Sequence, residues 1–123
     1  MTRNQLMNPK FSEMITSLAE KEFSPEVALK LADIIEKVVE EQAIFQEKHE
    51  AALNEFSEKD ESGNRKLTED GSKVILTDEL AFGKRMKVIR EEEVDLPTID
   101  LQDLGNAPVK PQEMVLLKHI IKR

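Results

Sequence analysis

Two histidines, His49 and His119, are the side chains best suited to metal binding or proton transfer near neutral pH. They lie far apart in the sequence, and neither has the spacing to other residues that zinc sites or catalytic triads show. The chain contains no cysteine, which excludes disulfides, thiolate metal sites and a cysteine nucleophile. Its four glycines are scattered and form no phosphate-binding loop.

Asp60, Ser62 and Asn64 have the spacing that opens a calcium-binding loop. Such a loop needs glycine at its sixth position and glutamate at its twelfth, and these positions hold Arg65 and Gly71. The segment is therefore predicted to be a helix end and a turn. Because 25 of the residues are Asp or Glu, no pair of carboxylates is distinctive. We expect no catalytic residue, no metal site and no cofactor, and we expect that the protein is not an enzyme.

The composition is that of a small acidic protein, with 123 residues, a net charge of −7 and 35% charged residues. We expect a single domain over residues 1–123. An acidic balance argues against non-specific binding to nucleic acid and to anionic membrane surfaces. No apolar stretch is long enough to span a membrane, and the first residues do not resemble a signal peptide. These features predict a soluble intracellular protein.

One long amphipathic helix, from Ser24 to about Glu58, is expected to organise the chain. Ser24, Pro25 and Glu26 are typical of a helix start, and no glycine or proline follows before Gly63. About 35 helical residues would span roughly 52 Å at 1.5 Å per residue. A compact globule of this size is only about 35 Å across. Part of the helix should therefore project or lie along a partner helix, and its narrow second half is typical of a coiled-coil seam.

Before the long helix, residues 1–8 are polar and are expected to be flexible. Asn8 and Pro9 predict the start of a short helix that runs to about Glu20. Its apolar face consists of Phe11, Met14, Ile15 and Leu18. This face would cover the wide apolar first half of the long helix.

After the long helix, residues 66–76 are expected to form a β-hairpin, with Asp70 and Gly71 in its turn. Thr77 begins a second helix to about Glu92, which should lie antiparallel to the second half of the long helix. Gly83 lies within this helix and is expected to weaken it. It is also expected to permit either close helix approach or a bend.

The last part of the chain, residues 93–123, is expected to return as an extended segment and end in a helix. Pro97 excludes a central strand there, so residues 94–101 are predicted to be extended or an edge strand. Residues 104–108 form a loop, and Pro111 begins the final helix, which includes Ile120 and Ile121 on its apolar face. The fold class is therefore mainly α with one small β-hairpin. We expect a protruding antiparallel helical hairpin over residues 24–92, with the β-hairpin at its tip, and a small base formed by the short N- and C-terminal helices.

Several short motifs resemble those of a family of small tailed-phage proteins, the DUF1617-like proteins. They are Ala28-Leu29-Lys30-Leu31 in the long helix, the turn Glu58-Lys59-Asp60-Glu61-Ser62-Gly63-Asn64, the pair Asp70-Gly71, and Glu93-Val94-Asp95-Leu96. With the terminal apolar helix, the likeness covers roughly residues 15–121. The resemblance implies a phage origin and action in the cytoplasm of an infected bacterial cell or in the virion. It implies no catalytic residues. The order helix, β-hairpin, helix is also similar in shape to prefoldin subunits, which is an analogy of form alone.

The excess apolar surface of the long helix predicts self-association and protein binding. Gln42 and His49 fill polar positions of the seam, where such residues can fix the register or the oligomeric state. The predicted interface consists of Leu31, Ile35, Val38, Gln42, Phe45, His49, Phe56, Phe82 and Met86.

Two functions fit this surface. The first is a phage structural or assembly factor that acts through helix packing, as a homo-oligomer or on a phage or host protein. The alternative is a small inhibitor or modulator of a host or defence protein, acting through acidic residues such as Glu91, Glu92 and Glu93.

Overall fold

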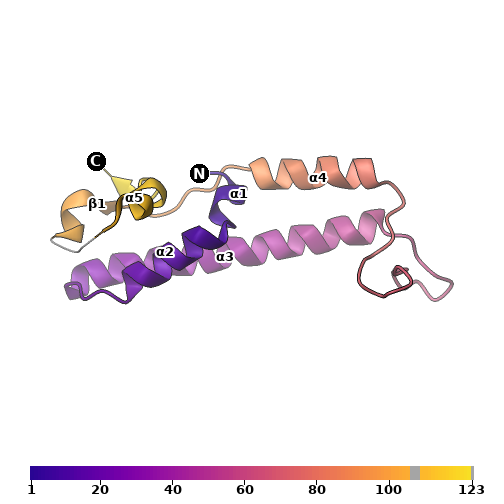
Figure 1. The fold of residues 1–123 in the computed structure, drawn as a ribbon, viewed down its shortest axis with the longest axis horizontal. Helices are drawn as coiled ribbons and strands as arrows, with labels where there is room; N and C mark the ends of the chain where they lie inside the picture. The colour runs from indigo at the N-terminus through magenta and orange to yellow at the C-terminus, as the bar shows by residue number, and fades with distance from the viewer. Residues whose placement is uncertain (106–108, 123) are drawn as a thin grey trace. The chain divides into compact units, whose positions relative to one another are not determined.

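The computed structural model describes residues 1–105 and 109–122 and is mostly helical, as the sequence predicts (Figure 1). The chain divides into two compact units. Unit 1 comprises Met1–Gln42 and Glu93–Arg123, and unit 2 comprises Ala43–Glu92. The long helix α3 (Pro25–Phe56) contributes residues to both units.

Helix α3 confirms the predicted long helix, with bounds within two residues of those expected at either end. The Ser24 carbonyl accepts a hydrogen bond from the Ala28 N–H at 2.9 Å, and the Ser24 hydroxyl accepts one from the Val27 N–H at 3.4 Å. Ser24 therefore satisfies backbone donors of the first turn that have no partner within the helix. The regular helix ends at Phe56, seven residues before Gly63.

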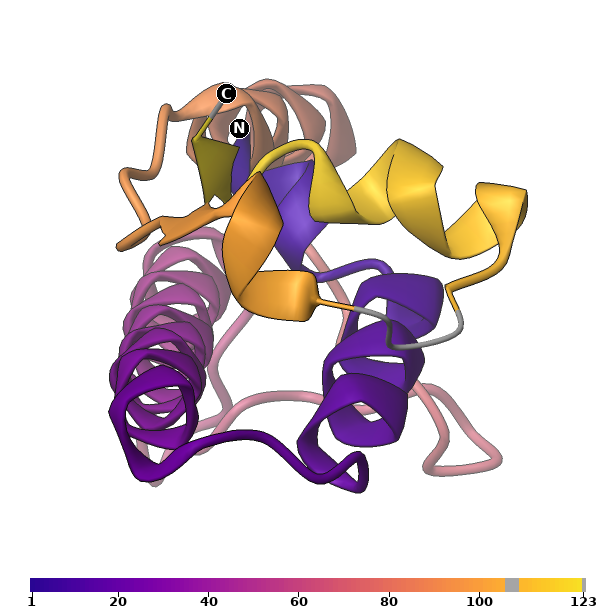
Figure 2. The same ribbon diagram turned by 90° about the vertical axis from the view of Figure 1, so that its left-hand side faces the viewer.

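In unit 1, helix α2 (Pro9–Ala19) packs beside the first part of α3, as predicted. The Asn8 side chain accepts a hydrogen bond from the Lys10 N–H, and Pro9 occupies the first helical position. Figure 2 shows the C-terminal segment lying across this helix pair. The core contains these buried apolar side chains: Leu6, Phe11, Met14, Ile15, Leu18, Val27, Leu31, Ile34, Val38, Val94, Ile99, Leu104, Leu117, Ile120 and Ile121.

The first eight residues differ from the flexible tail that we expected. They contain a short helix, α1 (Arg3–Leu6), which Thr2 caps through a reciprocal pair of hydrogen bonds with Gln5. Leu6 is completely buried, and Arg3 is 5% exposed. The polar composition of this segment does not lead to flexibility, because Arg3 is buried in an ion pair with Glu41, which lies 38 residues away in the sequence.

The C-terminal region of unit 1 is extended where predicted but ends differently. Strand β1 (Ile99–Asp100) pairs in parallel with β2 (Ile121–Lys122) to form a two-stranded sheet. A 3₁₀ turn, η1 (Leu101–Leu104), follows β1, and α5 (Pro111–Leu117) precedes β2. Residues 106–108 of the predicted loop lie outside the described residues.

The expected final helix is therefore too long at its C-terminal end. Ile120 accepts a hydrogen bond at its carbonyl from the Ile99 N–H, at 2.8 Å. Ile120 and Ile121 are both buried. Their β-branched side chains suit a strand, and pairing with β1 gives their backbone partners that the helical periodicity of the sequence does not reveal.

Unit 2 contains the remainder of α3, Ala43 onwards, and helix α4 (Glu79–Glu91), which runs antiparallel alongside it (Figure 1). Asp78 caps α4 by accepting a hydrogen bond from the Ala81 N–H. Ala52, Met86 and Ile89 form the buried cluster between the two helices. The predicted antiparallel helix pair is thus present in this unit.

The predicted hairpin at residues 66–76 appears as one antiparallel bridge, between Leu67 and Val74, and not as two strands. Its turn is as expected: the Gly71 N–H donates to the Thr68 carbonyl at 2.8 Å, and Gly71 has a φ of 73°. The two arms also bond directly, because the Ile75 N–H donates to the Lys66 carbonyl at 2.9 Å, and Glu58 bonds to both arms, donating to Ile75 and accepting from Lys66. The backbone hydrogen bonds of this region therefore link three short segments, around Glu58, Lys66 and Ile75.

Candidate protein-binding surfaces

A surface groove of about 200 Å³ lies between the end of α2 and the first part of α3 in unit 1. Three alanines line its sides, Ala19, Ala28 and Ala32, while Leu31 and Ile35 lie at its base. Phe23 and Lys21, from the connection between the helices, complete the lining. The groove is concave, mainly apolar and bordered by helices, which are the features that a docked amphipathic helix requires.

The groove lies on the side of α3 that faces away from the C-terminal segment. Lys30 marks the covered side, because its Nζ lies 3.0 Å from Asp103 Oδ2. Asp103 raises the pKa of Lys30, and Lys30 in turn lowers the pKa of Asp103. At about 100° per residue, Ala28 and Ala32 point nearly opposite to Lys30. Both alanines are exposed.

Gln42 lies further along the same side of α3 and joins it to α2. Its Nε2 donates to the Ser12 hydroxyl at 3.4 Å. This long hydrogen bond crosses between the two helices beyond the groove. The structure thus gives Gln42 a partner within the chain, where the sequence predicts a polar position in a seam between helices.

In unit 2, four partly buried rings form a row, which we call the aromatic row: Phe45, His49, Phe82 and Phe56. Phe45 stacks on His49 with ring centroids 6.1 Å apart, His49 contacts Phe82 at 6.3 Å, and Phe82 meets Phe56 edge to face at 6.4 Å. The guanidinium of Arg85 lies 5.4 Å from the centroid of Phe56. These contacts within unit 2 account for much of the apolar surface that the sequence leaves without a partner.

The structure sorts the nine predicted interface residues into two groups. Leu31, Val38 and Met86 are at most 6% exposed and belong to the cores of the chain, so in this conformation they offer little area to a partner. The other six are partly buried: Ile35, Gln42, Phe45, His49, Phe56 and Phe82. The groove contains Leu31 and Ile35, and the aromatic row contains four more of the set.

Sequence reasoning missed the alanines of the groove. Ala28 and Ala32 are four residues apart, so they lie on one side of a helix, and this spacing is visible in the sequence. Their role depends on the packing of α2, because Ala19 and Phe23 supply the opposite wall. Alanine is too common in helices to signal a groove by itself.

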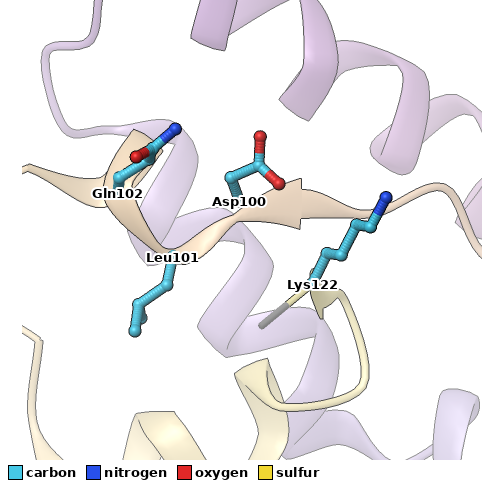
Figure 3. Close-up of a pocket in the computed structure, with 4 residues that line it drawn as sticks. All are labelled: Asp100, Leu101, Gln102 and Lys122. Carbon is cyan, nitrogen blue, oxygen red and sulfur yellow. The ribbon is translucent and has the colours of Figure 1, made fainter.

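A larger and more open hollow of about 610 Å³ lies at the end of the β1–β2 pair in unit 1. Asp100, Leu101, Gln102 and Lys122 line it, and Figure 3 shows Leu101 pointing away from Asp100 and Lys122. Asp100 and Lys122 are neighbours in the strand register. The lining supplies one carboxylate, one amide and one amine.

The two histidines belong to different environments. His49 is part of the aromatic row of unit 2, and His119 follows α5 in unit 1. Burial lowers the pKa of His119, and nearby positive charges, including Lys118, act in the same direction. Within residues 1–105 and 109–122, no three side chains of the metal-binding kinds are grouped so that they could hold an ion.

The described helices also include none that is both long and apolar enough to cross a membrane.

The run Glu91–Glu93 is partly neutralised within the chain. Glu92 Oε2 lies 2.8 Å from Lys48 Nζ in unit 2. Glu93 lies in unit 1, where its carboxylate is 3.4 Å from the amino group of Met1. These ion pairs reduce the free negative charge that this run presents.

No protein-family model matches this chain, and neither a curated protein nor a solved structure matches it significantly. The resemblance to the tailed-phage family stays a prediction based on short motifs.

Proposed function

We propose that this protein is a non-enzymatic protein-binding module, a structural or assembly factor that acts through helix packing. The observation that supports this most directly is the groove between α2 and α3, with its alanine walls and its apolar base. Small side chains allow a partner helix to approach closely, and the apolar base rewards the burial of its side chains. The phage setting of the proposal rests on the resemblance of the short motifs.

The test is an affinity capture with the tagged protein from infected and uninfected bacterial lysates, with the bound proteins identified by mass spectrometry. Ala32→Glu fills the groove with a charged side chain, and because Ala32 is exposed, the helix and the core should tolerate the change. Ala51→Glu is the matched control, since Ala51 is also exposed on α3 but does not line the groove. The wild type and Ala51→Glu should capture the same specific partner. Ala32→Glu should capture at most one-tenth as much of it, which corresponds to a loss of about 1.4 kcal/mol in binding free energy.

The outcome also separates the two functions. Capture of phage structural proteins from infected lysate alone supports an assembly factor. A single host protein captured from both lysates, with binding weakened by salt, supports an inhibitor or modulator. If Ala32→Glu retains every partner of the wild type, the groove is not the binding surface and the proposal fails.

A further inference from the structure

We infer that the occupant of the groove is the outer face of α4 from a second copy of this chain, so that copies join head to tail. The inference rests on the proposed function, because it names the partner of the same groove. Two surfaces carry it, one in each unit.

The outer face of α4 is exposed among the described residues and has the chemistry of a docking helix. Leu80 is 71% exposed and Val88 is 63% exposed, although both are large apolar side chains. They lie on the side of α4 away from Met86 and Ile89, which fill the core of unit 2. Lys84 lies midway between them, so one exposed stripe combines apolar and basic side chains.

The spacing of this stripe matches the groove. Leu80 and Val88 are eight residues apart, which is about 12 Å along a helix. The part of α3 that lines the groove, from Ala28 to Ile35, is about 10.5 Å long on the same scale. Two apolar side chains at this separation can occupy the two ends of the groove. The alanine walls leave room for the aliphatic stem of Lys84 between them.

The charges of the two surfaces are complementary. Glu20, Glu22 and Glu36 are exposed in the segments that border the groove, and Lys21 is the one cation among its lining residues. The exposed residues of α4 include Lys84, Lys87 and Arg90, with Glu91 at its end. In a chain with a net charge of −7, a basic helix face is a local exception. This basic face is complementary in charge to the carboxylates of Glu20, Glu22 and Glu36 that border the groove.

Because the groove and the α4 face are different surfaces, the contact is heterologous. A pair of copies joined in this way still has one free groove and one free helix face, so association continues until the contacts close into a ring, or it extends as a filament. Assemblies formed through this contact should therefore grow with protein concentration. The contact should weaken as salt screens the charges.

The test uses full-length protein and measures molar mass by sedimentation velocity over a range of concentrations. The first variant reverses the helix face, Lys84→Glu with Lys87→Glu, and the second reverses the groove border, Glu22→Lys with Glu36→Lys. The control for the first variant is Lys66→Glu with Lys73→Glu, which makes the same change of charge at exposed sites outside α4. The wild type and the control should form large species, and each reversed variant should associate at least tenfold more weakly.

An equimolar mixture of the two reversed variants should recover association, because opposite charges then face each other in both pairings. The acidic helix of one variant meets the basic groove border of the other, and the unchanged basic helix meets the unchanged acidic border. Recovery also shows that both variants are folded. A wild type that stays monomeric at all concentrations overturns the inference, and so does association that survives both reversals. If these results occur while Ala32→Glu still abolishes capture of another protein, the proposed function stands and only the identity of the occupant is wrong.

Discussion

At the residue scale, the ion pair between Arg3 and Glu41 is the most buried charge interaction described in the structure. Arg3 Nη1 lies 2.7 Å from Glu41 Oε2 and 3.3 Å from the Glu41 carbonyl oxygen. Arg3 is 5% exposed and Glu41 is 8% exposed. Lys37 reaches the other carboxylate oxygen, at 3.3 Å. The pair joins α1 to α3 within unit 1, where the Thr2 cap and the buried Leu6 also support the short helix.

Replacing Arg3 by alanine should destabilise the protein by about 3 kcal/mol, because it leaves the Glu41 carboxylate buried without its main partner. Urea unfolding followed by circular dichroism measures this change. Lys37→Ala is the control. Lys37 is far more exposed than Arg3, so its loss should cost about 0.5 kcal/mol or less. Equal losses for the two variants would contradict the special role of the buried pair.

The same pair predicts a dependence of stability on pH. Burial alone would raise the pKa of Glu41, but Arg3 and Lys37 outweigh it and hold that pKa below its ordinary value of 4.5. Since the carboxyl takes up a proton more readily in the unfolded chain, its contribution is present above this value and is lost as the pH falls below it. The Glu41→Gln variant should lose stability less steeply than the wild type below about pH 4.5. Identical slopes would show that Glu41 is not responsible.

At the scale of elements, α4 carries a weakness in its own sequence. Gly83 lies inside the helix and is exposed, and a Cβ atom added there meets nothing within 4 Å. The interpretation that this glycine permits close helix approach is therefore wrong. The residue costs helix stability without a contact that requires it.

Gly83→Ala should stabilise the protein by about 0.5 to 1 kcal/mol, because alanine has the higher helix propensity and fits the open space. Thermal unfolding measures the change. Gly71→Ala is the matched comparison, since Gly71 is equally open but has a φ of 73°, a conformation that alanine adopts only with strain. The two substitutions should therefore have opposite signs. A loss of stability in Gly83→Ala would mean that α4 is not a regular helix at that position.

At the scale of the whole molecule, the buried apolar side chains among the described residues form one cluster in each unit. The cluster of unit 1 contains fifteen buried residues, and that of unit 2 contains only Ala52, Met86 and Ile89, with Phe45 and Phe82 packed against it. Unit 2 should therefore open more readily than unit 1, because less apolar surface stabilises it.

Met86→Ala should remove about 2 to 4 kcal/mol, since it leaves a cavity in the smaller cluster. Hydrogen exchange should then show faster exchange in α4, while the amides of α2 keep their protection. Val88→Ala shortens an exposed side chain of the same helix and should change exchange little. Equal loss of protection in α2 and α4 would mean that the two clusters unfold as one.

The local features of this protein can be read from its sequence, because a few neighbouring residues encode them. Asn8 with Pro9, Ser24 with Pro25, and Asp78 mark helix starts through hydrogen bonds made within one turn. The Gly71 turn is equally local. Apolar periodicity then identified the long helix and its antiparallel partner in unit 2.

Tertiary structure decided the features that depend on residues distant in sequence. Arg3 can be buried because it forms an ion pair with Glu41, and Ile121 is in a strand because it pairs with Ile99. The same holds for the proposed binding surface: Leu31, Val38 and Met86 belong to the cores, while Ala28 and Ala32 are left open as groove walls. Periodicity shows which side of a helix is apolar, but only the packed neighbours determine how much of that side stays accessible to a partner.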